Sequence, residues 1–201
     1  MTPQAASKAN DTTLLDHEEV LHLALEAMRS SRHGDALQHL KDAAARWPDN
    51  PNVHFLLGAE HAQIGLFERA VEDMTAAVRL DPEFVPARFQ LGLLFLTHGR
   101  VVEAQSAWKP LDTLDAANPY LHFKQGLESL AHDDFAACRE SLARGLALNT
   151  SNPALNREMQ RIVEEAAALH AASDAAEKSA SDAPAPRHVL LSAYTREGSG
   201  S

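Results

Sequence analysis

The chain has 201 residues, of which 45% are apolar and 23% are charged, a composition typical of one globular domain with tails. Acidic residues outnumber basic ones 28 to 18, which gives a net charge of −10. With no cluster of Lys and Arg to offset it, this charge disfavours binding to nucleic acid or to an anionic membrane.

The chain begins with residues 1–15, which we predict to be a disordered tail. This segment has no apolar core of the length that a signal peptide needs. No later stretch approaches the roughly 18 consecutive apolar residues of a membrane-spanning helix. We therefore expect a cytoplasmic protein without membrane insertion.

Residues 17–152 repeat with a fixed period. Lines of 34 residues that start at His17, Pro51, Val85 and Pro119 align without insertion or deletion. Two columns of this alignment hold small residues, and a third holds large apolar residues. The eighth column contains Ala24, Gly58, Gly92 and Gly126, the twentieth Ala36, Ala70, Ala104 and Cys138, and the twenty-fourth Leu40, Met74, Trp108 and Leu142. Such a period predicts a two-helix unit that buries its apolar face only by stacking on its neighbours.

Glycine and proline positions agree with this division into helices. Glycine in the middle of a helix costs up to about 1 kcal/mol of helix propensity relative to alanine, so we expect a second helix to approach closely at the eighth column. Pro51, Pro119 and Pro153 fall at first helical positions, where no backbone N–H is needed. Pro110 instead falls inside a predicted helix, and we expect it to bend that helix.

At these columns the chain resembles the tetratricopeptide repeat family, whose 34-residue unit consists of two antiparallel helices, A and B. The second line carries the family pattern most completely. Its turn glycine, helix B residues and closing proline are Gly65, Ala70, Met74, Ala77 and Pro82. The resemblance implies an all-α fold, a right-handed superhelix of four helix-turn-helix repeats with a C-terminal capping helix. The four repeats are 17–50, 51–84, 85–118 and 119–152.

The other three lines depart from the family pattern at one or two of these positions each. Ser31 stands at the turn of the first line, where glycine is usual. The third line has Pro110 inside helix B and Ala116 where the closing proline is usual. In the fourth line, Gly145 and Thr150 replace the usual Ala and Pro. Each match alone is weak, but four lines in one register strongly indicate the family.

Two further segments follow the repeats. Residues 153–172 place apolar side chains at spacings of three and four, with charged residues on the other side, so we predict one amphipathic helix that caps the stack. Residues 173–201 are predicted to form a flexible tail, because they begin with a small, polar stretch that contains prolines. Within this tail, the apolar segment 188–195 contains Val189, Leu190, Leu191 and Tyr194.

The sequence offers no pattern of catalytic or metal-binding residues. Cys138 is the only cysteine, which excludes a disulfide framework and a cysteine-based metal site. His17 and His22 are five residues apart and point to different sides of a helix. His54 and His61 share one helix face, but the family packs their columns against helix B, so we expect packed or hydrogen-bonded side chains. We therefore expect no enzymatic activity, no cofactor and no bound metal ion.

The resemblance places a binding surface on the inner, concave wall of the superhelix, which helix A of each repeat lines. In this chain most wall positions are apolar. The candidate peptide-binding residues are Leu21, Leu25, Met28, Phe55, Ala59, Phe89, Leu93, Leu96, Tyr120, Phe123 and Leu127. Helices that are apolar nearly all round are normally buried, and an open apolar trough exceeds what soluble monomers usually expose. We therefore predict that a chain segment covers this wall.

Several covers are compatible with the sequence. An apolar peptide or helix of another protein would make this chain a non-catalytic adaptor or chaperone, which is the function that we predict. Alternatively, the chain is a regulatory or substrate-presenting subunit of an enzyme or of a secretion or assembly complex. In that case its own segment 188–195 would occupy the groove, either to inhibit binding or to associate with a second copy. Finally, the stacked helices could bury the wall themselves.

Overall fold

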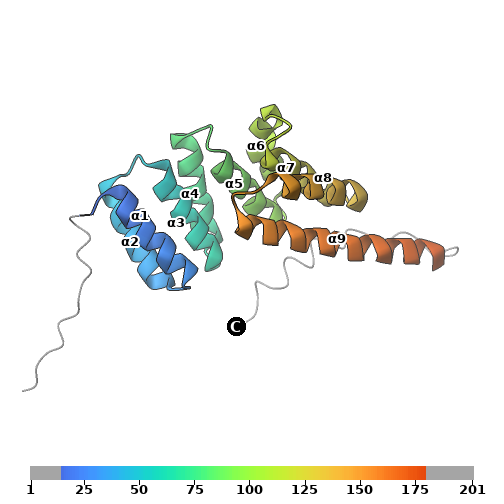
Figure 1. Ribbon diagram of the computed structural model, residues 1–201, viewed down its shortest axis with the longest axis horizontal. Coiled ribbons are helices and arrows are strands. Elements are labelled where there is room, and N and C mark those ends of the chain that lie inside the picture. Colours follow the sequence, from blue (N-terminus) through green and yellow to red (C-terminus); the bar gives the residue numbers. More distant parts are fainter. Residues whose placement is uncertain (1–14, 180–201) are drawn as a thin grey trace, which may run out of the picture. The chain divides into compact units, whose positions relative to one another are not determined.

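The computed structural model describes residues 15–179 (Figure 1). The apolar segment 188–195 lies outside the described residues, as does the N-terminal tail up to residue 14. The described part of the chain forms nine α-helices and one 3-10 segment, which confirms the predicted all-α fold. It divides into two compact units, the first ending at Asp81 and the second starting at Pro82.

The first unit contains two helix pairs. In Figure 1, α1 (His17–Arg29) pairs with α2 (His33–Arg46), and α3 (Pro51–Gln63) pairs with α4 (Phe67–Leu80). Because α2 also packs against α3, the two pairs are joined. The buried core at this junction comprises Val20, Ala24, Leu40, Ala43, Val53 and Leu57.

The second unit begins with two further pairs. The first consists of α5 (Val85–Thr97) and α6 (Val101–Trp108), which continues as the 3-10 segment η2 (Lys109–Thr113). The second pair consists of α7 (Pro119–Ala131) and α8 (Phe135–Leu148). Each helix of the family pattern is therefore present, and helix B of the third line is shorter than its counterparts.

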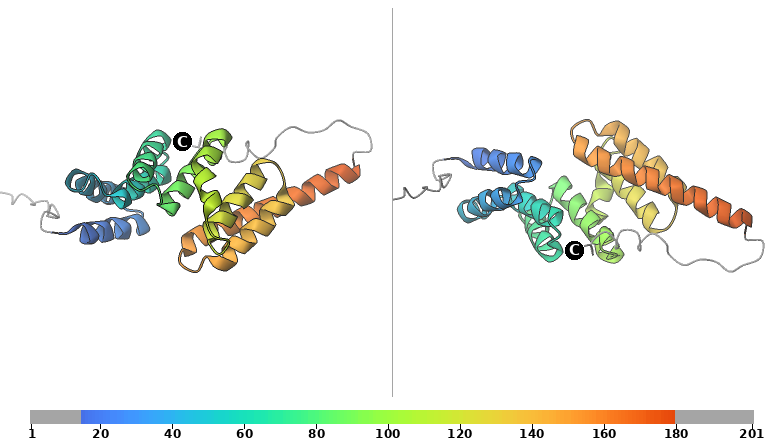
Figure 2. Two further views of the ribbon diagram at one scale, coloured as in Figure 1. Left: turned by 90° about the horizontal axis from the view of Figure 1, so that it is seen from above. Right: turned by 90° about the horizontal axis from the view of Figure 1, so that it is seen from below.

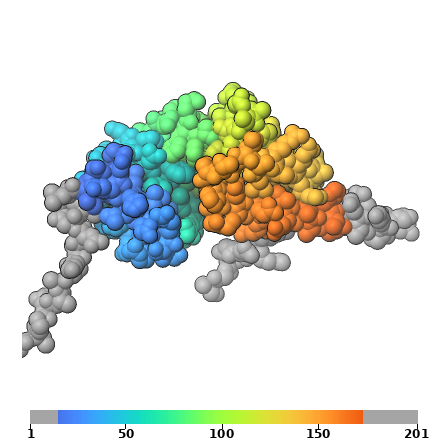
Figure 3. Space-filling view, in the orientation of Figure 1, coloured from blue at the N-terminus to red at the C-terminus, as the bar shows by residue number. Residues whose placement is uncertain are grey.

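The long helix α9 (Pro153–Ser179) completes the second unit by packing against α8. Its buried side chains, among them Leu155, Met159 and Ile162, belong to the same core as α5 to α8. The helix runs beyond the range 153–172 expected for the capping helix, and Figure 2 shows its last turns extending past α8. In the space-filling view, the orange residues of α9 form part of the surface of this unit (Figure 3).

Pro110 changes the type of helix rather than ending it. The α-helix α6 stops at Trp108, and residues Lys109–Thr113 continue with 3-10 geometry. A proline has no N–H to donate to the carbonyl four residues earlier, and its ring crowds that carbonyl. The tighter 3-10 turn is a common way to end a helix. The change of helix type is found at the position where the bend was expected, and the bend itself stays a prediction.

The turn between helices A and B has the same backbone conformation in all four repeats. Its fifteenth-column residue has a positive φ angle, which is 54° at Ser31, 77° at Gly65, 74° at Gly99 and 59° at Asp133. Glycine adopts this left-handed conformation freely, whereas other residues bring Cβ into close contact with the backbone. The substitution of Ser31 for the usual glycine thus leaves the turn intact but strained.

The eighth-column glycines allow helix B to approach helix A, as predicted. A Cβ atom added at Gly92 would lie only 2.1 Å from Nε1 of Trp108, the large twenty-fourth-column residue of the same repeat. Protein interiors are close-packed, so the space that the missing side chain leaves is filled by the indole ring. Ala24 and Leu40 take the corresponding positions in the first repeat and are fully buried.

Among residues 15–179, none of the helices combines the length and the apolar character that a membrane span requires.

Candidate functional site

The predicted wall residues of the second unit lie mainly in its core. Phe89, Leu93, Phe123 and Leu127 are buried, and all four belong to one apolar cluster. The half-buried Leu96 and Tyr120 pack against that cluster. The stacked helices of this unit therefore cover most of its share of the predicted wall.

Aromatic rings account for much of this burial. The ring centroid of Phe89 lies 5.3 Å from that of Tyr120, 6.1 Å from that of Trp108 and 6.2 Å from that of Phe123. Pairs of rings at these separations add to the stability that burial provides. Phe89, Tyr120 and Phe123, which we predicted to line an open groove, therefore pack against one another.

Gly145, an unusual residue in its column, is explained by Phe123. A Cβ atom added at Gly145 would lie 2.4 Å from Cδ1 of Phe123. The phenylalanine ring fills the space that the usual alanine would need, so it points toward α8 instead of into a groove. Gly145 in place of the usual alanine was therefore a signal in the sequence for a close approach of α7 to α8, which the prediction of an open wall did not use.

In the first unit the predicted wall residues are less buried than those of the second unit. The side chain of Leu25 on α1 is 39% exposed. Leu21 and Met28, on the same side of the helix, are half-buried and pack against the core. Leu56 of α3 is half-buried in the same way. Phe55 and Ala59 of α3 are half-buried as well. We call Leu21, Leu25 and Met28 the α1 strip.

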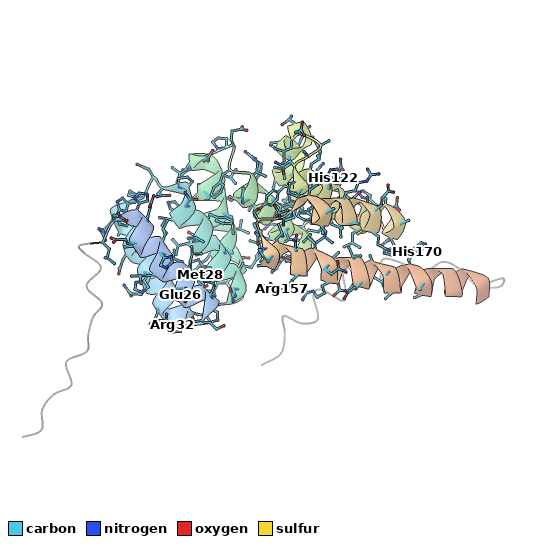
Figure 4. All side chains as sticks on the ribbon, in the orientation of Figure 1. Glu26, Met28, Arg32, His122, Arg157 and His170 are labelled. Atoms are coloured by element: carbon cyan, nitrogen blue, oxygen red, sulfur yellow. The ribbon has the colours of Figure 1, made fainter. Side chains whose placement is uncertain are left out.

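Charged side chains flank the α1 strip. Glu18 and Glu26 are exposed, and Oε2 of Glu26 lies 2.6 Å from Nη2 of Arg29. Figure 4 shows Glu26 and Met28 near the end of α1, with Arg32 at the turn into α2. An exposed i, i+3 ion pair of this kind contributes little to stability. Glu18, three residues before Leu21, and Arg29, four residues after Leu25, fall on the line of the strip, whereas Glu26 lies about 100° round the helix from Leu25. The strip therefore has one acidic and one basic residue at its ends.

Two histidine–carboxylate pairs attach α3 to its neighbours. Nδ1 of His33 on α2 lies 2.7 Å from Oε1 of the fully buried Glu60, and Nδ1 of His61 lies 2.7 Å from Oδ2 of Asp73 on α4. His54 donates from Nε2 to the carbonyl of Pro48. The histidines at 54 and 61 are thus hydrogen-bonded, as expected. Glu60 was missed, although its spacing from Leu57 places it on the packed side of α3.

Lys124 forms an ion-pair network that the sequence pattern did not predict. Its Nζ contacts Oδ1 of Asp112 in η2 and lies 2.8 Å from Oε2 of Glu128. Burial disfavours the charged ammonium, but the hydrogen bonds to both carboxylates outweigh it and raise the pKa of Lys124. The network ties the segment that follows Pro110 to the next repeat.

Neither an activated cysteine nor a cluster of metal ligands is formed by the described side chains. Burial, with a smaller contribution from Asp134, raises the pKa of the Cys138 thiol to about 11, so the thiolate needed of a nucleophile is rare at neutral pH. Within residues 15–172, no three or more His, Cys, Asp or Glu side chains are grouped so that they could hold a metal ion. Among the predicted wall residues, Leu25 of the α1 strip is the most exposed.

The sequence matches a family model described as a tetratricopeptide repeat, over residues 21–82 and 60–108. A similar protein is the small glutamine-rich tetratricopeptide repeat-containing protein 2 of Mycosarcoma maydis, 27% identical over 148 residues. That alignment covers 74% of this chain and 39% of the relative. DnaJ homolog subfamily C member 3 of Rattus norvegicus is 30% identical over 94 residues, which are 47% of this chain and 19% of that protein. The chain thus spans well under half the length of either relative.

A solved structure shows the same fold. The crystal structure of TTC0263, a thermophilic tetratricopeptide repeat protein of Thermus thermophilus, superposes with a TM-score of 0.61. The match covers 76% of this chain and 81% of that chain, at 18% sequence identity. At this identity the likeness speaks for the fold alone.

Proposed function

This chain is a tetratricopeptide repeat protein, and from that premise we propose that it is a non-catalytic adaptor or chaperone that binds an apolar peptide or helix of another protein. Repeat proteins of this kind mediate interactions between proteins through their exposed surfaces. The name of one relative, a DnaJ homolog, favours the chaperone form of the proposal.

The accessible α1 strip is the observation that carries the proposal. Leu25 is exposed and Leu21 and Met28 are half-buried, so a partner could bury all three. Fully burying an exposed Leu or Met side chain contributes about 1.5 to 3 kcal/mol, and each contributes less here because all three are already more than half buried. Association and ordering offset part of this gain. Because a micromolar dissociation constant corresponds to about 8 kcal/mol, the strip by itself supports binding weaker than micromolar, and tighter binding needs further contacts. Phe55 and Ala59 extend the candidate surface, whereas Phe89, Leu93, Phe123 and Leu127 support the fold.

Leu25→Asp tests this assignment, with Leu66→Asp as the matched control. Leu66 is 43% exposed in the same unit but lies at the start of α4. The full chain and both variants are used to isolate partners from the source cells, and partner affinity is then measured. Leu25→Asp should lower affinity at least about tenfold, and Leu66→Asp should not. Equal affinity of both variants contradicts the proposed surface.

The apolar segment 188–195 favours a second candidate function. The chain would then be a regulatory or substrate-presenting subunit of an enzyme or assembly complex, and Val189, Leu190, Leu191 and Tyr194 would cover the strip until a partner displaces them. Deletion of residues 183–201 should raise affinity for an apolar peptide or dye. Unchanged affinity on deletion counts against this candidate, and recovery of one stoichiometric enzyme, in place of many unfolded clients, supports it.

A further inference from the structure

The α1 strip has oppositely charged residues at its two ends. Glu18 comes three residues before Leu21, and Arg29 comes four residues after Leu25. Both charged side chains are exposed. Arg29 contacts Glu26 at 2.6 Å, but an exposed pair contributes little to stability, and a guanidinium has enough N–H donors to bind a second carboxylate. The strip therefore runs from a negative end to a positive end.

The charged and the apolar residues of this line lie on opposite sides of Leu25. Because a helix turns by about 100° per residue, Glu18 and Arg29 lie about 20° and 40° to one side of Leu25, and Leu21 and Met28 lie about 40° and 60° to the other. Leu21 and Met28 are half-buried against the core, whereas Leu25 is 39% exposed. The strip thus has an apolar margin toward the core and a charged margin away from it.

This arrangement is self-complementary under two-fold symmetry. In a two-fold interface, residue i of one copy contacts residue j of the other, and j contacts i. The midpoint of Glu18 and Arg29 lies about one residue, or about 1.5 Å along the helix, from the midpoint of Leu21 and Met28. One axis level with Ala24 therefore serves both pairs. It also sets the charged margin of one antiparallel helix against the charged margin of the other, and the apolar margins against each other.

We propose that the α1 strip is an interface between two copies of this chain, in which the two α1 helices pack antiparallel. Glu18 of each copy pairs with Arg29 of the other, Leu21 meets Met28, and the two Leu25 side chains meet beside the axis. A parallel arrangement would instead oppose like charges at both ends. The net charge of −10 acts against association, but charges separated by more than about 8 Å are largely screened at physiological salt, whereas the paired charges are in contact.

The dimer is weak, because each copy contributes three side chains that are already more than half buried. We expect a dissociation constant of about 100 µM. The inference does not rest on the function proposed above, although the two share a surface. A partner that binds the strip has to displace the second copy, so dimerisation and partner binding compete.

Sedimentation velocity of the full chain between about 10 µM and about 1 mM tests the dimer. Wild type should pass from monomer to dimer across this range. Glu18→Lys and Arg29→Glu each replace two attractions by two repulsions and should each weaken dimerisation at least about tenfold. Glu68→Lys makes the same charge change at an exposed first-turn glutamate of α4 in the same unit, and it should have little effect. Circular dichroism checks that the variants keep their helices.

Mixing the variants tests the antiparallel arrangement. In an equimolar mixture of Glu18→Lys and Arg29→Glu, every charge across a mixed interface again faces an opposite charge, so mixed dimers should form although neither variant dimerises well alone. The double variant with both changes should dimerise like wild type. It should not form mixed dimers with wild type, because like charges then meet at both ends, whereas a parallel arrangement would favour such mixing.

The outcomes distinguish this inference from the proposed function. A wild type that stays monomeric up to about 1 mM overturns the dimer and leaves the partner surface standing. Dimerisation that is insensitive to Leu25→Asp, or equally sensitive to Glu18→Lys and Glu68→Lys, places the interface elsewhere and overturns the inference. The absence of mixed dimers between the two single variants overturns it as well. Dimerisation that is lost on Leu25→Asp, with partner affinity unchanged, supports the dimer and removes the proposed partner surface.

Discussion

The indole Nε1 of Trp108 donates a hydrogen bond of 2.9 Å to the backbone carbonyl of Phe89, across the gap at Gly92. The indole stays buried without leaving its N–H unsatisfied. The same ring stacks on the side chain of Phe89. Close packing at Gly92 and the hydrogen bond to Phe89 therefore hold helix A and helix B of the third repeat together at the same place.

Gly92→Ala should lower the free energy of unfolding by about 2 kcal/mol. The new Cβ would lie 2.1 Å from the indole nitrogen, and overpacking of this kind outweighs the better helix propensity of alanine. Urea unfolding followed by circular dichroism measures the change. Gly34→Ala is the control, because no atom lies within 4 Å of its added Cβ. A similar loss at Gly34 would contradict the close-approach explanation.

Ser31→Gly should raise the free energy of unfolding by about 1 kcal/mol, because it relieves a left-handed residue with a Cβ atom. The reverse change, Gly65→Ala, should lower it by about the same amount. No atom lies within 4 Å of the Cβ added at Gly65, so its cost comes from the backbone alone. Thermal and urea unfolding of both variants give the two values. Destabilisation by Ser31→Gly is the result that this explanation does not allow.

Phe89→Ala and Leu25→Ala should have opposite effects on stability and on partner binding. Truncation of the fully buried Phe89 should cost about 3 to 5 kcal/mol of stability and leave the affinity of the first unit for its partner unchanged. Truncation of Leu25 should cost less than about 1 kcal/mol and weaken partner binding. Both quantities are measured on each variant. Weakened binding in a folded Phe89→Ala variant would return that residue to the binding surface.

The Lys124 network should make stability fall at high pH. Because the folded-state pKa lies above the ordinary value of 10.5, the contribution of the charged form is fully present below pH 10.5 and is lost as the pH rises through the folded-state pKa. Wild type should therefore lose stability more steeply than Lys124→Met as the pH rises above about 10.5. Urea unfolding at several pH values compares them. If the free energy of unfolding varied with pH in the same way for both proteins, the ionisation of Lys124 would not contribute to stability.

Local patterns were sufficient to predict the helices and their pairing. The 34-residue period, the small eighth column and the prolines at first helical positions each depend on residues within one repeat, and helix formation and pairing depend mainly on such local spacing. The left-handed turn at Ser31 and Asp133 lies where the family pattern expects glycine. The prediction was strengthened by the repeat, because the same residue types recur at the same positions in all four 34-residue lines.

Only the tertiary structure decided which wall residues are exposed. Phe55, Phe89 and Phe123 occupy the same column, yet Phe89 and Phe123 are buried and Phe55 is half-buried. Their exposure depends on neighbours that the spacing does not reveal, such as Gly145 beside Phe123. Exposure is set by what packs against a side chain across the fold, and those partners are distant in sequence, so periodicity defines the face of a helix but not what covers it.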